Sequence, residues 1–321
     1  VKLCGDRAAL SLVHDCSQLR TIDELSLSSM RLGSSYGLPL FSGPALRNVR
    51  SLNLGHNAMG VLGITPLLEC PHLDVLESLN LDDNRLGTPG LAALAESDLL
   101  RQLRSLSLDS SRVTADGMVA VGNGNRLQKL MSLRAERSGL SDTGVRALAR
   151  SDGFRPKLLD LMLAGIGEQG VIDAAASDLF SRVEYLNLDW NQRIGDRGVA
   201  ALAKSVMPRL RVLNLSRTRL SDQGGTALLA SNSLAGVQEL LLRSNQLGRR
   251  FMQALAESDC LAHLVSLDIA ANEIDDAGIK LLEQTKVISS LRRLRCDRNP
   301  ISEAAVRRLK DSGNFPSLQL P

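Results

Sequence analysis

Aliphatic residues recur along this chain in one fixed pattern. In residues 76–86 leucine and asparagine are arranged as L-x-x-L-x-L-x-x-N-x-L. The opening aliphatic of this pattern recurs at Ile22, Val49, Leu76, Leu103, Leu130, Leu158, Val183, Leu210, Val237, Leu264, Leu291 and Leu318. Nine of the eleven intervals are 27 residues, and the other two are 28 and 25. One period held along the chain predicts a stack of equivalent structural units.

Each unit has the pattern of a short strand followed by a helix. Side chains alternate along a strand, so in residues 78–82 Leu79 and Leu81 face one side and the polar residues the other. In residues 91–95 (LAALA) the apolar side chains form one stripe that can cover those leucines. Strands stack about 4.8 Å apart, whereas packed helices need about 8–10 Å, so the sheet must curve. The sequence predicts an α/β solenoid, a horseshoe with a concave parallel sheet and helices on the convex side.

The helix starts are marked by capping residues and by a column of glycines. Thr114, Ser141, Ser221 and Ser302 each precede an early acidic residue, as is typical of a helix N-terminus. Glycine follows at Gly63, Gly90, Gly117, Gly144, Gly170, Gly198, Gly224 and Gly278. We expect glycine there because the helix approaches the strand too closely for a side chain.

An asparagine recurs where the chain turns out of the strand. This asparagine column comprises Asn57, Asn84, Asn191, Asn245, Asn272 and Asn299. A buried amide at this place can satisfy backbone groups that the turn leaves unpaired. We therefore expect Asn84 to be structural, and we expect Asn80, which faces the concave surface, to contribute little to stability.

On these residues the chain resembles the ribonuclease-inhibitor-like branch of the leucine-rich repeat proteins. The near-constant 27-residue period and the AL-A-x-S ending look more like bacterial members of that branch. The resemblance implies a protein-binding horseshoe and no particular ligand. We expect a single domain over residues 1–321, with a partial repeat or capping helix at 1–21, about eleven repeats from 22 to 317 and a terminal edge at 318–321.

Composition narrows the class of partner. The 38 basic and 35 acidic residues leave a net charge of +3, which gives little support to binding of nucleic acid or of a membrane surface. Neither a signal peptide nor a long apolar run is present. The five cysteines lack a pairing pattern, and Cys260 and Cys296 replace core leucines. We expect a cytoplasmic protein with a protein partner.

Two glycine motifs match patterns of cofactor-binding or catalytic sites, but a structural role in the repeat accounts for them better. The motif GIGEQG at 165–170 matches the dinucleotide-binding pattern after a predicted strand at 161–163, but its last two glycines stand in register with Gly87 and Gly90. The motif GSSYG at 33–37 matches a nucleophile elbow but has no identifiable histidine and acid to complete a triad. The four histidines lack metal-ligand spacing. We predict no catalytic residue, no metal site and no cofactor.

The middle of the chain departs from the regular repeat. We interpret repeat 5 as carrying one extra residue near Gly153 and Pro156. Repeat 6 then loses two residues after Leu163, and with them its asparagine. Because repeat 6 is the shortest unit on this interpretation, we expect the rim of the solenoid to be cut back there.

The candidate site is an apolar island at this irregular place. Trp190, the only tryptophan, follows a strand that carries Tyr185, the only aromatic residue in the two concave columns. Met162 and Val212 are expected on the flanking strands, about 4.8 Å away. Tryptophan and tyrosine are enriched at binding hot spots, and an apolar patch with a polar rim marks a contact surface. The predicted partner-binding site comprises Tyr185, Trp190, Met162, Val212, Asp189 and Asn187. The alternative is that Trp190 folds inward and fills the space left by repeat 6.

Charged residues form a second candidate surface, because acids gather early in the chain and arginines late. The residues are Asp82, Asp83, Asp109, Arg243, Arg295 and Arg298. They predict a bipolar docking surface, and a solvated face is the alternative.

The sequence favours a non-enzymatic module that recognises a protein on its concave face. One alternative is a regulator of a partner enzyme, such as a GTPase activator, because a horseshoe can supply an asparagine or arginine to a partner's site. The Asn84-Arg85 turn is too generic to argue this role. The other alternative is a structural spacer, since the chain starts inside a repeat at Val1 and a larger parent protein is expected.

Overall fold

The computed structural model describes residues 21–34, 41–42, 44–123, 126–285 and 288–312. The chain divides into two compact units, Val1–Leu158 and Leu159–Pro321. The predicted terminal edge at 318–321, and the predicted cap at 1–21 apart from Thr21, lie outside the described residues. The single domain and the horseshoe shape stay predictions.

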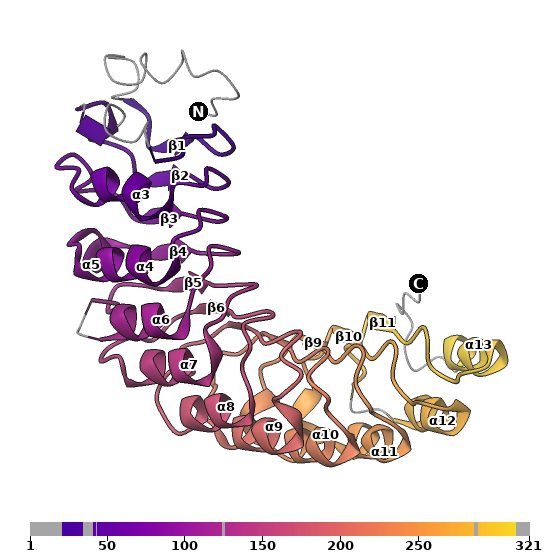
Figure 1. Ribbon diagram of the computed structural model, residues 1–321. Helices are drawn as coiled ribbons and strands as arrows, with labels where there is room; N and C mark the ends of the chain where they lie inside the picture. The colour runs from indigo at the N-terminus through magenta and orange to yellow at the C-terminus, as the bar shows by residue number, and fades with distance from the viewer. Residues whose placement is uncertain (1–20, 35–40, 43, 124–125, 286–287, 313–321) are drawn as a thin grey trace. The chain divides into compact units, whose positions relative to one another are not determined.

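Strands and helices alternate in the first unit (Figure 1). Its elements are β1 (Glu24–Ser26), the 3-10 helix η2 (Pro44–Leu46), β2 (Ser51–Asn53), α3 (Gly60–Leu68), β3 (Ser78–Asn80), α4 (Gly87–Glu96), α5 (Leu99–Gln102), β4 (Ser105–Ser107), α6 (Ala115–Gly122), β5 (Ser132–Arg134) and α7 (Ser141–Arg150). Each strand pairs in parallel with the next one along the chain.

The same alternation continues in the second unit, whose boundary falls within β6. The elements are β6 (Leu158–Asp160), α8 (Glu168–Ala175), β7 (Tyr185–Asn187), α9 (Gly195–Lys204), β8 (Val212–Asn214), α10 (Asp222–Leu229), η3 (Asn232–Leu234), β9 (Glu239–Leu241), α11 (Arg249–Glu257), η4 (Asp259–Leu261), β10 (Ser266–Asp268), α12 (Asp276–Gln284), β11 (Arg293–Arg295) and α13 (Glu303–Asp311). Over the described residues, β1 to β11 follow in chain order in a parallel sheet. The predicted α/β solenoid is confirmed. None of the described helices is long and apolar enough to cross a bilayer.

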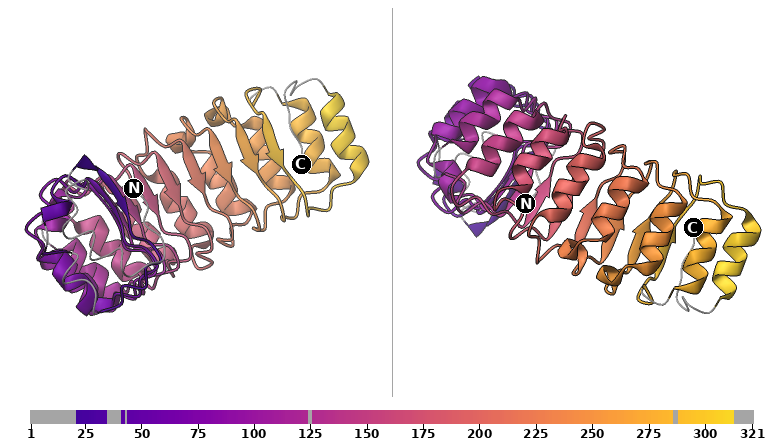
Figure 2. Two further views of the ribbon diagram at one scale, coloured as in Figure 1. Left: turned by 90° about the horizontal axis from the view of Figure 1, so that it is seen from above. Right: turned by 90° about the horizontal axis from the view of Figure 1, so that it is seen from below.

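Leucines that alternate with polar residues form the core, as the pattern predicts. Leu79 and Leu81 are buried, and Leu79 lies opposite Leu106 of the next strand. On α4, Leu91 and Leu94 are buried too. Helices of successive repeats lie side by side, as α9 and α10 do in Figure 2. Each repeat therefore covers the leucines of its neighbours, and none could bury them alone.

The glycine column serves the packing of helix on helix. A Cβ added to Gly117 would lie 2.5 Å from Cδ1 of Leu91, in the helix of the preceding repeat. A Cβ on Gly224 would lie 2.8 Å from Cα of Asp196, again in the preceding helix. The expectation that these glycines face the strand is therefore wrong. The close neighbours are the preceding helix and the turn that leads into the glycine's own helix.

Three of the four predicted capping residues cap a helix. The hydroxyls of Thr114, Ser221 and Ser302 accept hydrogen bonds from backbone N–H groups in the first turns of α6, α10 and α13, at 3.1–3.2 Å. Ser141 makes no such bond and lies inside α7 with a φ of 55°. The prediction is therefore wrong at Ser141.

An aspartate in the first turn of one helix also holds the start of the next. Asp196 accepts the backbone N–H of Ser221 at 2.8 Å and its hydroxyl at 2.6 Å. Asp276 accepts the same two groups of Ser302, both at 2.7 Å. These hydrogen bonds from Ser302, backbone first, lower the pKa of the Asp276 carboxyl. Such carboxylates link successive repeats on the helix side of the solenoid.

The asparagine column is structural, as predicted. Asn84 is buried. Its Nδ2 donates to the carbonyls of Leu54 at 2.9 Å and Asp82 at 3.2 Å, and its Oδ1 accepts the N–H of Met59 at 3.2 Å. Asn80 also has structural partners, because its Oδ1 accepts the N–H of Asp82 at 2.9 Å and its Nδ2 donates to the Asp82 carboxylate at 2.7 Å. The expectation that Asn80 contributes little is therefore revised below.

The predicted strand at 161–163 is wrong, because β6 ends at Asp160. The N–H of Leu158 donates to the Met131 carbonyl at 3.0 Å, just as Ser78 donates to Arg50 at 2.9 Å in the regular repeat. Leu158 therefore takes the place of Ser78, two positions further into the repeat than the sequence interpretation put it.

The true opening position of repeat 6 is Pro156, which is buried. Repeat 5 then runs 26 residues from Leu130, and repeat 6 has the full 27 residues up to Val183. Ala164 occupies the asparagine position, since its N–H donates to Oδ1 of Asn191 at 3.2 Å. The predicted shortening of repeat 6, and with it the cut-back rim, is wrong.

Candidate partner-binding surface

The third residue after each strand is left-handed in every repeat that the structure describes. We call these positions the left-handed column. It comprises Ser29, His56, Asp83, Ser110, Arg137, Leu163, Trp190, Arg217, Ser244, Ala271 and Arg298, with φ between 50° and 62°. The residue types share no pattern that reveals this conformation, which only glycine and asparagine adopt readily. Stacking favours it, because at nine of these eleven positions the N–H bonds to the next repeat, as Asp83 does to the Asp109 carbonyl at 2.8 Å.

Trp190 lies in the left-handed column and is 42% exposed. The alternative in which it fills a space between repeats is therefore wrong. The Arg217 guanidinium lies over its indole ring, with Cζ 4.8 Å from the ring centre. At this distance the cation and the ring attract each other.

Asp189 holds Arg217 in this position. Nε and Nη2 of Arg217 donate to the two carboxylate oxygens of Asp189 at 2.9 and 2.5 Å. Asp189 is 5% exposed, and its own N–H donates to Oδ1 of Asn187 at 3.0 Å. A two-point contact to a buried carboxylate fixes the plane of a guanidinium. Trp190 is consequently presented to solvent in an ordered setting.

Leu163 extends this surface and was missed by the sequence prediction. It is 43% exposed, and its N–H donates to the Asp189 carbonyl at 2.8 Å. The N–H of Trp190 donates in turn to the Ser216 carbonyl at 3.1 Å, next to Arg217. Leu163, Trp190 and Arg217 thus occupy equivalent places in three successive repeats, and we call them the Trp190 row. The misplaced register of repeat 6 hid Leu163.

Of the predicted apolar island, Tyr185 and Val212 lie on paired strands, whereas Met162 does not lie on a strand. Tyr185 lies opposite Val212 in the paired strands β7 and β8, and both side chains are half-buried. Met162 is not on a strand; it follows β6, at the position that Asp189 holds in the next repeat. It is also half-buried. The expectation that Met162 flanks Tyr185 from the neighbouring strand is therefore wrong.

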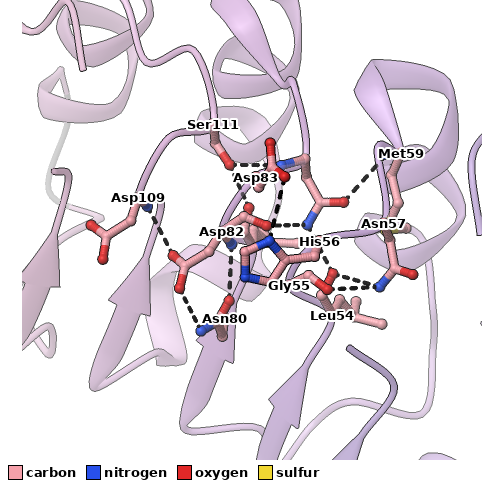
Figure 3. A network of polar contacts seen from close by, with 12 residues as sticks. Leu54, Gly55, His56, Asn57, Met59, Asn80, Asp82, Asp83, Asp109 and Ser111 are labelled. Carbon is pink, nitrogen blue, oxygen red and sulfur yellow. Dashed lines mark hydrogen bonds and ion pairs between the residues drawn. The ribbon is translucent and has the colours of Figure 1, made fainter. Parts of the chain in front are cut away.

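The acids of the first unit are engaged with their own backbone (Figure 3). The carboxylate of Asp82 accepts the Ser107 hydroxyl at 2.6 Å and the N–H of Asp109 at 2.8 Å. In the same way, the Asp109 carboxylate accepts the N–H of Glu136 at 2.7 Å. Burial raises the pKa of the Asp109 carboxyl, and the charges of Asp82 and Glu136 add to this rise. Asp83 is exposed and lies 3.3 Å from Nδ1 of His56.

The three candidate arginines of the second unit all have acidic neighbours. Arg295 lies 3.7 Å from Asp268, and Arg243 and Arg298 both lie 4.0 Å from Asp297. These contacts are long, so the pairs are weak. The predicted bipolar surface would span both units, and it stays a prediction.

The cysteines, the metal-binding side chains and the two glycine motifs bear on the chemistry that the sequence predicts to be absent. Burial raises the pKa of the Cys70 and Cys260 thiols and that of Cys296 to about 11, so all three are poor nucleophiles at neutral pH. No cluster of three metal-binding side chains occurs within the described residues. In the G-x-G-x-x-G motif, Gly167 precedes α8 and Gly170 is buried in it, as the repeat requires. The G-x-S-x-G motif at 33–37 lies largely outside the described part of the chain.

Comparison with known proteins agrees with this geometry. A family model described as Leucine Rich repeat matches residues 45–68, 72–95, 183–203, 207–229 and 260–282. No curated protein sequence matches the chain. Among solved structures, the complex of Rad7 and Elc1 in yeast contains a similar chain, with a TM-score of 0.65 and 21% identity over 96% of this chain and 79% of that one.

A second similar structure is an internalin (inlF) from Listeria monocytogenes, with a TM-score of 0.55 and 15% identity over 98% of this chain and 93% of that one. Likeness at these identities shows the fold. The ribonuclease-inhibitor-like branch stays a prediction. The chain therefore has the fold of leucine-rich repeat proteins and contains segments that match the Leucine Rich repeat model.

Proposed function

We propose that the chain is a non-enzymatic recognition module that binds a protein through the Trp190 row of its second unit. The observation that carries the proposal is an exposed tryptophan held in a fixed setting by Arg217 and the buried Asp189. Tryptophan and arginine are enriched at binding hot spots. A side chain that is already ordered loses little entropy when a partner covers it.

The sheet beside the row supports the same surface. Tyr185 and Val212 are half-buried on the outward face of β7 and β8, on the strands that lead to Trp190 and Arg217. A partner that covers the Trp190 row can therefore reach them. The complex of Rad7 with Elc1 supports a protein as the class of partner, because Rad7 shares the fold.

The two alternative functions have no equivalent observation in their favour. A regulator that inserts an asparagine from a turn would need an accessible amide, and Asn84 is buried with its amide bonded to the backbone. A spacer has no use for an exposed, ordered tryptophan. Recognition is therefore the function that the surface supports best.

The test is capture of a protein from native lysate by the tagged full chain and by two variants. Trp190→Ala removes the centre of the row. Val206→Ala is the matched control, because Val206 is 73% exposed in the loop after α9 of the same unit. We expect wild type and Val206→Ala to retain the same protein and Trp190→Ala to lose it, with unchanged melting temperatures. Retention by Trp190→Ala, or capture of nothing by wild type, contradicts the proposal.

A further inference from the structure

Two further arginines flank the Trp190 row. Arg193, in the loop after Trp190, is exposed, and its Nη2 donates to the Gly165 carbonyl at 2.5 Å, two residues from Leu163. Arg219 is exposed two residues beyond Arg217, with a φ of 59°. Neither has a carboxylate within ion-pair distance among the described residues. Both cations are therefore available to a partner.

Positive charge dominates the loops that surround the row. We define the exit loops as the segments between a strand and the next helix, here 161–167, 188–194, 215–221 and 242–248. Together they contain four arginines and one aspartate. That aspartate is Asp189, whose charge is already balanced by Arg217. A partner that docks here must therefore approach a cationic surface.

The fold itself gives no reason for the apolar members of the row. Left-handed backbone costs free energy for a bulky side chain, and burial offsets only part of this cost at Leu163 and Trp190 because each is more than two-fifths exposed. Elsewhere in the left-handed column the residues are serine, histidine, aspartate, arginine or alanine. Exposed apolar side chains at a strained place point to a function outside folding.

We infer that the Trp190 row binds an acidic segment of the partner protein, one that carries an aliphatic or aromatic side chain between carboxylates. The apolar side chain packs against Leu163 and the open part of the Trp190 ring. The carboxylates pair with Arg193 and Arg219, the cations that have no carboxylate partner among the described residues. This inference rests on the proposed function and adds the chemistry of the partner.

A nucleic acid would also bring negative charge, but the row favours a peptide. Binding of single strands relies on aromatic side chains with an open face on which bases stack. The Arg217 guanidinium covers one face of the only tryptophan, and the neighbour in the row is the aliphatic Leu163. An apolar peptide side chain can pack against Leu163 and the edge of the Trp190 ring without an open aromatic face.

A displayed library of random peptides, selected on the wild-type full chain and counter-selected on Trp190→Ala, tests the inference. Because Trp190 is the sole tryptophan, the intrinsic fluorescence of the chain then reports binding of each selected peptide at this site. We expect the selected peptides to be acidic around an apolar residue and to bind more weakly as salt concentration rises. Selected peptides that are neutral or basic, or no Trp190-dependent selection at all, overturn the inference.

Charge reversal gives the matched comparison. Arg193→Glu/Arg219→Glu should weaken binding of the selected peptides by about tenfold or more. Arg182→Glu/Arg209→Glu makes the same change of charge with exposed residues that precede β7 and β8, at the opposite ends of the strands, and should leave affinity within about twofold. Equal effects of the two double variants, or tighter binding of a single-stranded oligonucleotide than of the peptides, overturn the inference. If Trp190→Ala abolishes partner capture but charge reversal has no effect, only the partner chemistry is wrong and the proposed function stands.

Discussion

The guanidinium of Arg217 lies 4.8 Å from the centre of the Trp190 ring. The two residues occupy the same position of successive repeats, so the contact is a direct product of repeat stacking. The Asp189 carboxylate beneath them binds the same guanidinium at two points. Three side chains from two repeats thus act as one structural unit at the surface.

This unit predicts a non-additive response to mutation. Arg217→Ala should lower the free energy of unfolding by about 1–3 kcal/mol, because the buried Asp189 loses its charged partner. In Asp189→Ala/Arg217→Ala no carboxylate is left unpaired, so the double variant should cost less than the sum of the single variants. Denaturant unfolding of all four proteins measures the coupling. Additive effects would show that the pair contributes nothing beyond its separate side chains.

Ser111 and Ser138 hold the same position of successive repeats in the asparagine column, and they should respond differently to alanine. The Ser111 hydroxyl donates to the Leu81 carbonyl at 2.5 Å and accepts the N–H of Asn84 at 3.0 Å. The buried hydroxyl of Ser138 has no hydrogen-bond partner among the described residues. Ser111→Ala should cost about 1–2 kcal/mol of unfolding free energy, whereas Ser138→Ala should be neutral or slightly stabilising. The reverse order in a denaturant titration would contradict the column as we describe it.

Asn84 and Asn80 allow a comparison within one repeat. Asn84→Ala should cost about 1–3 kcal/mol, because it leaves the buried Met59 N–H without its acceptor and removes one of the two amide donors to the Leu54 carbonyl. Asn80→Ala removes two bonds to Asp82 at a half-buried place that water can reach, so it should cost about 0.5–1.5 kcal/mol. Thermal and chemical denaturation measure both values. An Asn80 variant that is the less stable of the two would refute the assignment of Asn84 as the main structural amide.

Stability should depend on pH through Asp276. Hydrogen bonds from Ser302 lower the pKa of its carboxyl below the ordinary value of 3.8, so the folded state favours the charged form. The contribution of this carboxylate to stability is therefore fully present above pH 3.8 and is lost as the pH falls through the lower folded pKa. The stability difference between wild type and Asp276→Ala should shrink over that window. A difference that stays constant down to the pH at which the protein unfolds in acid would show that the hydrogen bonds do not stabilise the charged form of Asp276 selectively.

The regular part of the fold was predictable because its signals are local and repeated. Strand leucines such as Leu79, helix leucines such as Leu91 and the amide of Asn84 follow from alternation, helical spacing and hydrogen-bond satisfaction. The register of repeat 6 was not predictable in this way. Pro156 replaces the opening aliphatic and Leu158 follows two residues later, and a shift of two residues leaves strand alternation unchanged. The pattern therefore fitted the wrong alignment equally well.

The candidate site was predictable only in its centre. The rarity of aromatic residues drew attention to Trp190 and Tyr185. The left-handed conformation at Trp190 carries no residue signature, because the bonds between repeats favour it. The roles of Leu163 and Arg217 depend on which residues stacking brings side by side, and a wrong register for one repeat was enough to hide Leu163.

Site-directed photocrosslinking tests the central claim most directly. A p-benzoylphenylalanine in place of Leu163 stands next to Trp190 on the proposed surface. The same residue in place of Val206, in the loop after α9, or of Leu62, on α3 of the first unit, is exposed but does not belong to the row. Irradiation in native lysate should link a single protein to the chain from position 163 alone, and Trp190→Ala in the same chain should abolish the product. Crosslinks of equal yield from position 206 or 62, or a product at 163 that survives Trp190→Ala, would contradict the assignment of the Trp190 row as the partner-binding surface.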